Sequence, residues 1–354
     1  MEGPKPRSSG SSCSQRHRIE SMLRSQLSRP GQRIELVPLE RLPAALTHQA
    51  VDEGQQHNSW SSFGSGSGGD SNAGLLQEGS SGPSALASRQ WGLATDSLRL
   101  APGELELLSG PDGALCLLGE GSSSAVFLGR LAGQEDVAVK VAELAPGMDS
   151  RHVWDEASLL RTCVHRRLVA LLGVACQGQL LMLVMELMRG GDLHSALQRP
   201  DIRDALRWAA RGRQVALDVA EALAFLHSCG VQHADLKPSN VMLTVELRAK
   251  LTDLGVAQRL GSRSRQAVGG TTQYAAPEQL LGLPCTTQAD VYSLGVLLTV
   301  LCTGRPLAAR GQLCLPTAPD DCPQPVLELI RECIRPDPLR RPTAEEALRR
   351  LHDS

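Results

Sequence analysis

The spacing of apolar residues changes character along the 354-residue chain. Between residues 98 and 187, short apolar runs stand between Gly, Asp and Ser, as in residues 114–118 and 137–141. Such runs are typical of β-strands. Two further runs within 174–187 are interrupted at Gln177-Gly178-Gln179, which predicts a hairpin.

Beyond residue 190 the periodicity becomes helical. One helical face, ending at Gly230, carries Val215, Val219, Ala222, Leu223 and Leu226. Residues 289–302 are apolar almost all round, which predicts a helix buried in a helical lobe and ending at Gly304. Strands followed by helices predict an α+β fold with two segregated lobes.

Residues 1–97 have a different composition. Gly54–Arg89 is dominated by Ser, Gly, Gln and Asn, so it cannot bury enough apolar area to offset the entropy of ordering. We therefore predict a disordered N-terminal extension at 1–97, ahead of a domain at 98–353. Its β-rich lobe would span 98–187 and its helical lobe 188–353.

Two stretches of this extension are more apolar than the rest. Ile19, Met22, Leu23 and Leu27 recur near helical spacing, and residues 37–46 are mildly apolar. They admit two interpretations, short docking segments for a partner protein or incidental apolar residues in an unstructured tail.

Charge and cysteine content narrow the function classes. A formal net charge of −2 provides no strongly basic field for phosphates, which argues against nucleic-acid binding as the main function. The ten cysteines form no C-x-x-C pair, so reduced thiols in an intracellular protein are expected. A polar N-terminus and the lack of any long uncharged apolar run predict no membrane span and a cytoplasmic protein, with the nucleus as the alternative.

A Gly-rich segment lies between two predicted strands. It reads Leu118-Gly119-Glu120-Gly121-Ser122-Ser123-Ser124-Ala125-Val126. Small residues allow the backbone to approach a triphosphate closely. A strand follows this loop where a dinucleotide-binding fold would place a helix, so the loop is expected to cover phosphates from above.

Lys140 ends the run Val137-Ala138-Val139-Lys140 in the next predicted strand. A lysine there is usually a solvent-facing edge residue, but Glu156 follows on the inner face of a predicted helix. A carboxylate on that face needs a cation, and Lys140 is the obvious one. At about 4 Å and an effective dielectric of about 20 the pair interacts by about 4 kcal/mol before desolvation.

The most specific pattern is His233-Ala234-Asp235-Leu236-Lys237-Pro238-Ser239-Asn240, with Asp253-Leu254-Gly255 and Ala276-Pro277-Glu278 downstream. With the loop, Lys140 and Glu156, these segments resemble the eukaryotic protein kinase family, in the order of its motifs. The resemblance covers about residues 98–351. Lys237 indicates the serine/threonine type, and residues 165–173 resemble the tyrosine-kinase-like group.

The resemblance implies roles for these positions in transferring the γ-phosphoryl group of ATP. Asp235 would orient the substrate hydroxyl, Lys237 would neutralise the γ-phosphate, and Asn240 and Asp253 would hold Mg²⁺. Lys140, held by Glu156, would bind the α- and β-phosphates. The remaining residues of the nucleotide site would be Leu118, Gly119, Glu120, Gly121, Val126, Ala138, Glu186, Met188 and Met242.

Further positions follow from the same resemblance. Asp290 would anchor the catalytic loop, the segment 233–240. Arg341 would pair with Glu278, and Met185 would lie at the back of the adenine site. Thr271 would bond Asp235 and Lys237.

Three residues depart from the family pattern. Ala234 replaces the arginine that normally binds an activation-loop phosphate, so we predict activity that does not depend on such a phosphate at Ser262, Ser264, Thr271 or Thr272. Leu254 replaces the D-F-G phenylalanine and should still pack under the Glu156 helix. Ser124 replaces the third glycine of the loop.

The sequence thus predicts an ATP- and Mg²⁺-dependent serine/threonine protein kinase acting on protein substrates. The alternative is a catalytically weak pseudokinase that serves as a nucleotide-binding scaffold. Lys140, Glu156, Asp235, Asn240 and Asp253 are all present, and pseudokinases usually lack at least one of them.

Overall fold

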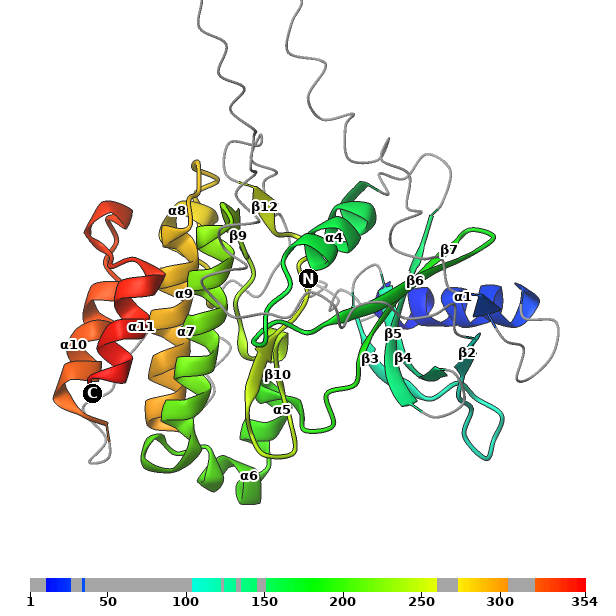
Figure 1. Ribbon diagram of the computed structural model, residues 1–354, viewed down its shortest axis with the longest axis horizontal. Coiled ribbons are helices and arrows are strands. Elements are labelled where there is room, and N and C mark those ends of the chain that lie inside the picture. The colour runs from blue at the N-terminus through cyan, green and yellow to red at the C-terminus, as the bar shows by residue number, and fades with distance from the viewer. Residues whose placement is uncertain are drawn as a thin grey trace, which may run out of the picture.

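A sheet-based lobe and a helical lobe lie side by side in the computed structural model (Figure 1). The structure describes residues 11–26, 34–35, 104–121, 124–131, 135–144, 151–259, 273–304 and 322–354. This arrangement confirms the predicted α+β fold with two segregated lobes.

The smaller lobe, called the N-lobe here, is built on a seven-stranded antiparallel sheet of order β1-β2-β4-β5-β7-β6, with β3 paired to β4. Its strands are β1 (Ile34–Glu35), β2 (Glu104–Leu107), β3 (Leu117–Glu120), β4 (Ser124–Leu131), β5 (Glu135–Glu143), β6 (Leu171–Gln177) and β7 (Leu180–Glu186). The predicted hairpin is β6–β7, and Gly178 at its turn has φ 56°. Helix α4 (Arg151–Thr162) belongs to the same lobe (Figure 1).

The larger lobe, the C-lobe, is mainly helical. Its α-helices are α5 (Leu193–Gln198), α6 (Pro200–Ala205), α7 (Arg213–Ser228), α8 (Pro277–Leu280), α9 (Gln288–Thr303), α10 (Gln324–Cys333) and α11 (Ala344–His352). Short helices of other types are η3 (Trp208–Gly212), η4 (Pro238–Asn240) and η5 (Pro338–Arg340). As predicted from its all-round apolarity, α9 is buried along nearly its whole length, and it ends at Gly304 with φ 61°.

Two small sheets lie beside these helices and position the loops between the lobes. One has the order β11 (Ala249–Leu251), β10 (Val241–Leu243), β8 (Gly191–Asp192), and the other pairs β12 (Gln258–Arg259) with β9 (Val231–Gln232). In the first sheet Met242 is the partner of Lys250. The catalytic-loop segment 233–240 therefore ends where β10 begins, and β11 leads directly into Asp253.

The N-terminal region contains structure that was not expected there. Residues Ser11–Gln26 form helix α1, which lies against β4 and β5, and β1 extends the sheet by pairing with β2. The expectation of an unstructured tail therefore fails for these two segments, because Ile19 and Leu23 are fully buried on the sheet. Residues 37–46 and 54–89 lie outside the described residues, and the domain boundary at residue 98 stays a prediction.

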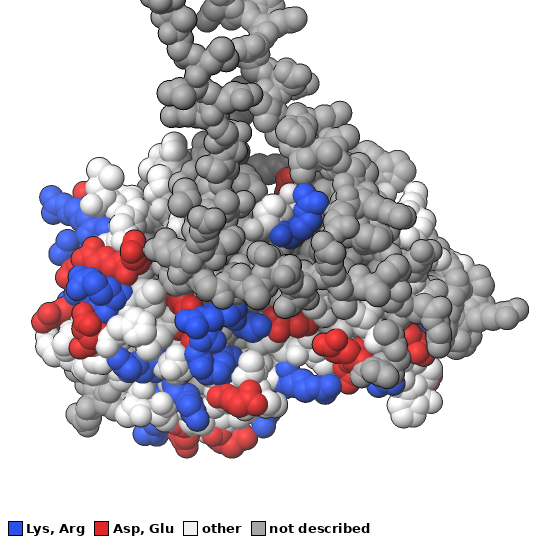
Figure 2. All heavy atoms as spheres, viewed as in Figure 1, with Lys and Arg blue, Asp and Glu red and all other residues white. Residues whose placement is uncertain are grey.

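Charges of both signs are interspersed over the helical lobe on the face drawn in Figure 2. In the part of the chain that the structure describes, no helix is long and apolar enough to cross a bilayer.

Candidate active site

Lys140 on β5 contacts two carboxylates from different parts of the chain. Its Nζ lies 2.7 and 2.8 Å from the Glu156 carboxylate oxygens on α4, and 2.9 Å from Asp253 Oδ1 after β11. The predicted Lys140–Glu156 ion pair is therefore present. Gly255 closes this cluster, since a Cβ at that position would lie 3.2 Å from Glu156 Oε2 and 3.3 Å from Asp253 Oδ1.

The charges of this cluster stabilise one another. Burial alone would lower the pKa of Lys140, but the charges of Glu156 and Asp253 raise it above its usual value. Burial would raise the pKa of Asp253, yet the charge and hydrogen bond of Lys140 bring it below its usual range. Lys140 is therefore cationic and Asp253 anionic at neutral pH.

Asp235, Lys237 and Asn240 converge in the catalytic loop. Lys237 Nζ donates to Asp235 Oδ2 at 2.7 Å, and Asn240 Nδ2 donates to the same oxygen at 3.0 Å and to the Asp235 carbonyl oxygen at 2.8 Å. Among the contacts of the described residues, neither Asp235 Oδ1 nor Asn240 Oδ1 takes part in a side-chain hydrogen bond.

The loop itself is held by the buried carboxylate of Asp290 on α9. Asp290 accepts hydrogen bonds from the backbone N–H groups of His233 and Ala234, both at 2.8 Å, and lies 2.8 Å from His227 Nε2. Ala234 has φ 67°, in the left-handed region that disfavours a side chain. Asp290 thus fixes a strained peptide, as predicted for the residue that anchors this loop.

His233 connects the catalytic loop to the segment that carries Asp253. Its Nδ1 accepts from the Asp235 N–H at 3.3 Å, and its Nε2 lies 3.1 Å from the Thr252 carbonyl oxygen. Because Nδ1 acts as an acceptor, Nε2 carries the proton and donates to Thr252. The fully buried imidazole therefore links the backbone at Asp235 to the backbone that precedes Asp253.

The predicted adenine site is bounded by residues from both lobes. Val126 on β4 and Ala138 on β5 are partly buried, as is Met242 on β10. Met185 on β7 is 6% exposed, which suits a residue at the back of a pocket. In the Gly-rich loop Leu118 is 48% exposed, and residues 122–123 lie outside the described residues.

Glu186 makes contacts that the sequence did not reveal. Its carboxylate accepts from Lys250 Nζ at 2.6 and 2.8 Å and from the Ala170 N–H at 2.8 Å, while its own N–H donates to the Ala170 carbonyl oxygen at 3.1 Å. The side chain thus joins the connection between the lobes to β11. Lys250 stands only three positions before Asp253, but lysines on short strands give no sequence signal for such a role.

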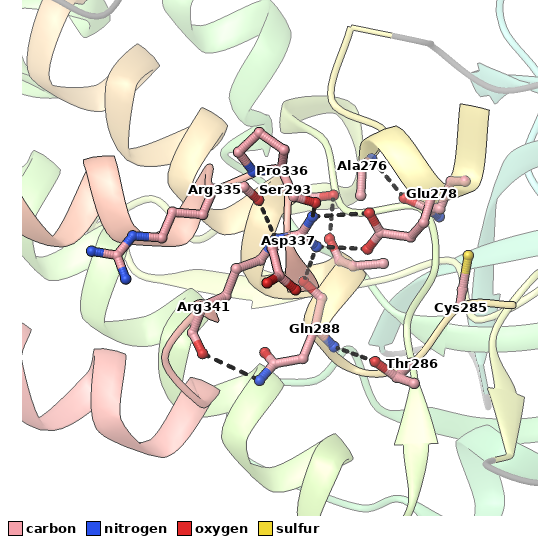
Figure 3. Close-up of polar contacts among 12 residues, drawn as sticks. Ala276, Glu278, Cys285, Thr286, Gln288, Ser293, Arg335, Pro336, Asp337 and Arg341 are labelled. Carbon is pink, nitrogen blue, oxygen red and sulfur yellow. Dashed lines mark hydrogen bonds and ion pairs between the residues drawn. The ribbon is translucent and has the colours of Figure 1, made fainter. Parts of the chain in front are cut away.

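A second predicted ion pair joins Arg341 to Glu278 in α8 (Figure 3). Arg341 donates from Nη1 to Glu278 Oε1 at 2.6 Å and from Nη2 to Oε2 at 2.9 Å, with its side chain fully buried. Its other N–H bonds reach the carbonyl oxygens of Arg335, Pro336 and Gln288.

The structure shows the surroundings of Leu254 and Ala234, two of the three residues that depart from the family pattern. Leu254 is 1% exposed and belongs to the same apolar core as Leu159 and Leu160 of α4, as expected for its position. The Ala234 carbonyl oxygen accepts from Gln279 Nε2 at 3.0 Å. The four candidate phosphorylation positions lie at 262–272, outside the described residues, so phosphate independence and the Thr271 contacts stay predictions.

Comparison with known proteins agrees with this geometry. Residues 114–352 match the protein kinase domain, and the chain belongs to that family. It is 36% identical over 266 residues to the serine/threonine-protein kinase PkaA of Streptomyces coelicolor, covering 66% of this chain and 48% of that protein.

Other relatives come from distant organisms. The chain is 32% identical over 252 residues to the RasGEF domain-containing serine/threonine-protein kinase X of Dictyostelium discoideum, covering 66% of this chain and 26% of that protein. It is 36% identical over 199 residues to the brassinosteroid LRR receptor kinase BRI1 of rice, covering 54% and 18%. The chain thus spans about half or less of the length of these relatives.

Proposed function

We propose that the protein transfers the γ-phosphoryl group of Mg²⁺-ATP to serine and threonine hydroxyls of protein substrates. The observation that carries the proposal is the convergence of Lys140, Glu156 and Asp253 in one cluster, with Asp235, Lys237 and Asn240 in the loop that His233 ties to it. Phosphoryl transfer needs alignment and charge neutralisation, and these residue types supply both.

Asp235 is the proposed acceptor of the substrate proton. Lys237 and Asn240 both bond its Oδ2, so Oδ1 is the oxygen left to face the hydroxyl. Lys237 places a cation beside the transferred group. Lys140 would hold the α- and β-phosphates, and the Gly-rich loop would cover them.

The side chains proposed for Mg²⁺ fit a hard cation. Asn240 uses its amide nitrogen within the protein, which leaves the amide oxygen, and Asp253 is bonded by Lys140 through Oδ1, which leaves Oδ2. Oxygen donors of this kind suit Mg²⁺, which normally keeps several waters besides one or two protein ligands. The ion, when bound, would neutralise phosphate charge.

The proposal is tested by phosphate transfer from labelled ATP to a serine/threonine peptide array. Asp235→Asn should reduce the rate by about 10²- to 10⁴-fold, the usual contribution of a positioned acid or base. Asp204→Asn, at an exposed carboxylate on α6, is the matched control and should leave the rate unchanged. Equal rates for Asp235→Asn and the unmodified protein would favour the pseudokinase alternative.

We also propose that the protein works in the cytoplasm, with the nucleus as the alternative. The ten cysteines of the sequence form no C-x-x-C pair, which suits a reducing compartment.

A further inference from the structure

The outer face of the N-lobe sheet is covered by residues from the N-terminal region of the chain. Ile19 and Leu23 of α1 are both fully buried, and Ile34 of β1 is 2% exposed. They share one apolar cluster with residues of β2, β4, β5 and β7, among them Leu105 and Phe127. Figure 1 shows α1 lying along this sheet.

The contact has polar as well as apolar components. Arg18 Nη2 lies 2.6 Å from Glu143 Oε1 at the end of β5, and the Glu143 side chain is only 6% exposed. β1 adds backbone pairing, with Ile34 opposite Leu105 and Glu35 opposite Glu104. The N-terminal region therefore contacts the sheet in three ways. These are the apolar face of α1, the Arg18–Glu143 ion pair and the backbone pairing of β1.

This interface lies outside the part of the chain that matches the kinase domain. The match begins at residue 114, whereas α1 and β1 lie within residues 11–35. Glu35 and Glu104 are nevertheless strand partners, although 69 positions separate them (104 − 35). The entropic cost of closing a loop rises only slowly with the length of the loop. The long connection from β1 to β2 therefore does not prevent this pairing.

The segment is placed to influence the nucleotide site through β5. Side chains alternate across a strand. Val139 and Val141 lie in the cluster with Ile19 and Leu23, while Lys140 between them contacts Glu156 on the opposite face. Any movement of β5 after loss of α1 would displace Lys140 as well.

We propose that α1 and β1 form a detachable cap that binds the N-lobe sheet in cis, with α1 on its outer face, and that the docked cap raises the affinity for ATP by holding β5. The docking of the cap does not depend on the proposed kinase activity. Only the effect of the cap on ATP affinity rests on that proposed function.

The docking is tested in the full chain with the double substitution Ile19→Asp and Leu23→Asp. A fluorescently labelled synthetic peptide of residues 11–35 should bind this variant and should not bind the unmodified protein, whose own segment occupies the surface. Ser21→Asp, at an exposed position on α1, is the matched control and should behave like the unmodified protein. A variant that keeps its cooperative unfolding transition but does not bind the peptide would overturn the proposal.

A second measurement avoids substitutions in the cap, in case the double variant does not fold. A protease recognition site is inserted in the Gly64–Gly69 run of the otherwise unmodified chain, and the chain is cleaved there. The released N-terminal fragment should co-elute with the kinase domain in size-exclusion chromatography at high concentration and separate on dilution. Immediate separation at every concentration would exclude a docked cap.

The effect on catalysis is measured as KM for ATP, separately from kcat. Release of the cap should raise KM by about tenfold, equivalent to about 1.4 kcal/mol, with kcat little changed, and added peptide should restore KM. If the unmodified protein transfers phosphate and its KM is the same with and without the cap, the role in ATP binding is wrong even where docking is seen. If it transfers none while the peptide binds the variant, the kinase proposal fails and the docking stands.

Discussion

Ala234 illustrates how single residues in the catalytic loop depend on distant partners. A left-handed backbone at an alanine costs about 1–2 kcal/mol, and Asp253 nearby has φ 65° as well. The backbone N–H groups of His233 and Ala234 both donate to the carboxylate of Asp290, which is 1% exposed. The strained backbone therefore persists because a buried carboxylate bonds it.

We expect Asp290→Ala to destabilise the protein by about 2–5 kcal/mol, because buried N–H donors lose their acceptor. Urea unfolding measures the loss, and phosphate transfer should fall with it. Ala234→Gly relieves the left-handed strain and should change stability by no more than about 1 kcal/mol. If Asp290→Ala changed neither the stability nor the rate of phosphate transfer, the loop would hold its geometry without this carboxylate.

At the scale of elements, Arg341 joins three parts of the C-lobe. Its side chain connects α8, through Glu278, to the start of α9, through the Gln288 carbonyl oxygen, and to the turn at Arg335 and Pro336 (Figure 3). Each of its five N–H donors is aimed at an oxygen, which a planar guanidinium allows and an ammonium does not.

Arg341→Lys should therefore destabilise the protein by about 2–4 kcal/mol, since several buried carbonyl oxygens lose their donor and the bidentate pair is broken. Thermal unfolding provides the measurement. Arg340→Lys is the matched control at a 74% exposed side chain and should stay within about 0.5 kcal/mol. An equal loss of stability in the two variants would contradict the role assigned to the buried guanidinium group of Arg341.

At the scale of the whole molecule, the segment between α4 and β6 connects the lobes. His165 stacks on Phe225 of α7 with ring centroids 4.6 Å apart. Arg166 Nε lies 2.6 Å and Arg167 Nε 3.2 Å from the Glu221 carboxylate, also on α7. The same segment pairs with β11 through the Val169 N–H and the Leu251 carbonyl oxygen at 2.9 Å. The N-lobe helix that carries Glu156 is thus tied to the C-lobe.

Glu221 gives this connection a defined pH dependence. Burial raises its pKa, but the contact with His165 and the hydrogen bonds from Arg166 and Arg167 outweigh that effect and lower the pKa to about 2. An unfolded glutamate titrates near 4.3. Because the folded pKa is the lower one, the carboxylate stabilises the fold fully above about pH 5, and this contribution is lost as the pH falls toward 2.

The stability difference between the unmodified protein and Glu221→Gln should consequently shrink by about 0.5 kcal/mol from pH 7 to pH 4. Urea unfolding at both pH values measures it. Glu328→Gln, at an exposed position on α10, is the control. A difference that grows at pH 4 would have the wrong sign and would contradict the proposed role.

Several features were predictable because their cause is local. The β6–β7 hairpin, the ends of α7 and α9 and the Lys140–Glu156 pair all follow from periodicity, glycine positions and motif order. Bonds between distant segments could not be predicted in this way. His227 as a partner of Asp290 and Lys250 as a partner of Glu186 lie 63 and 64 positions away, and neither has a distinctive local pattern.

The amino-acid sequence alone therefore determined the order of the lobes, the family resemblance and the set of residues proposed for phosphoryl transfer, since each depends on residue type and short-range spacing. Only the tertiary structure decided that Ile19 and Leu23 are buried on the N-lobe sheet, and that Asp290 holds Ala234 in the left-handed region. An apolar helical face indicates that something will cover it, but the covering surface is defined only when strands far along the chain come together.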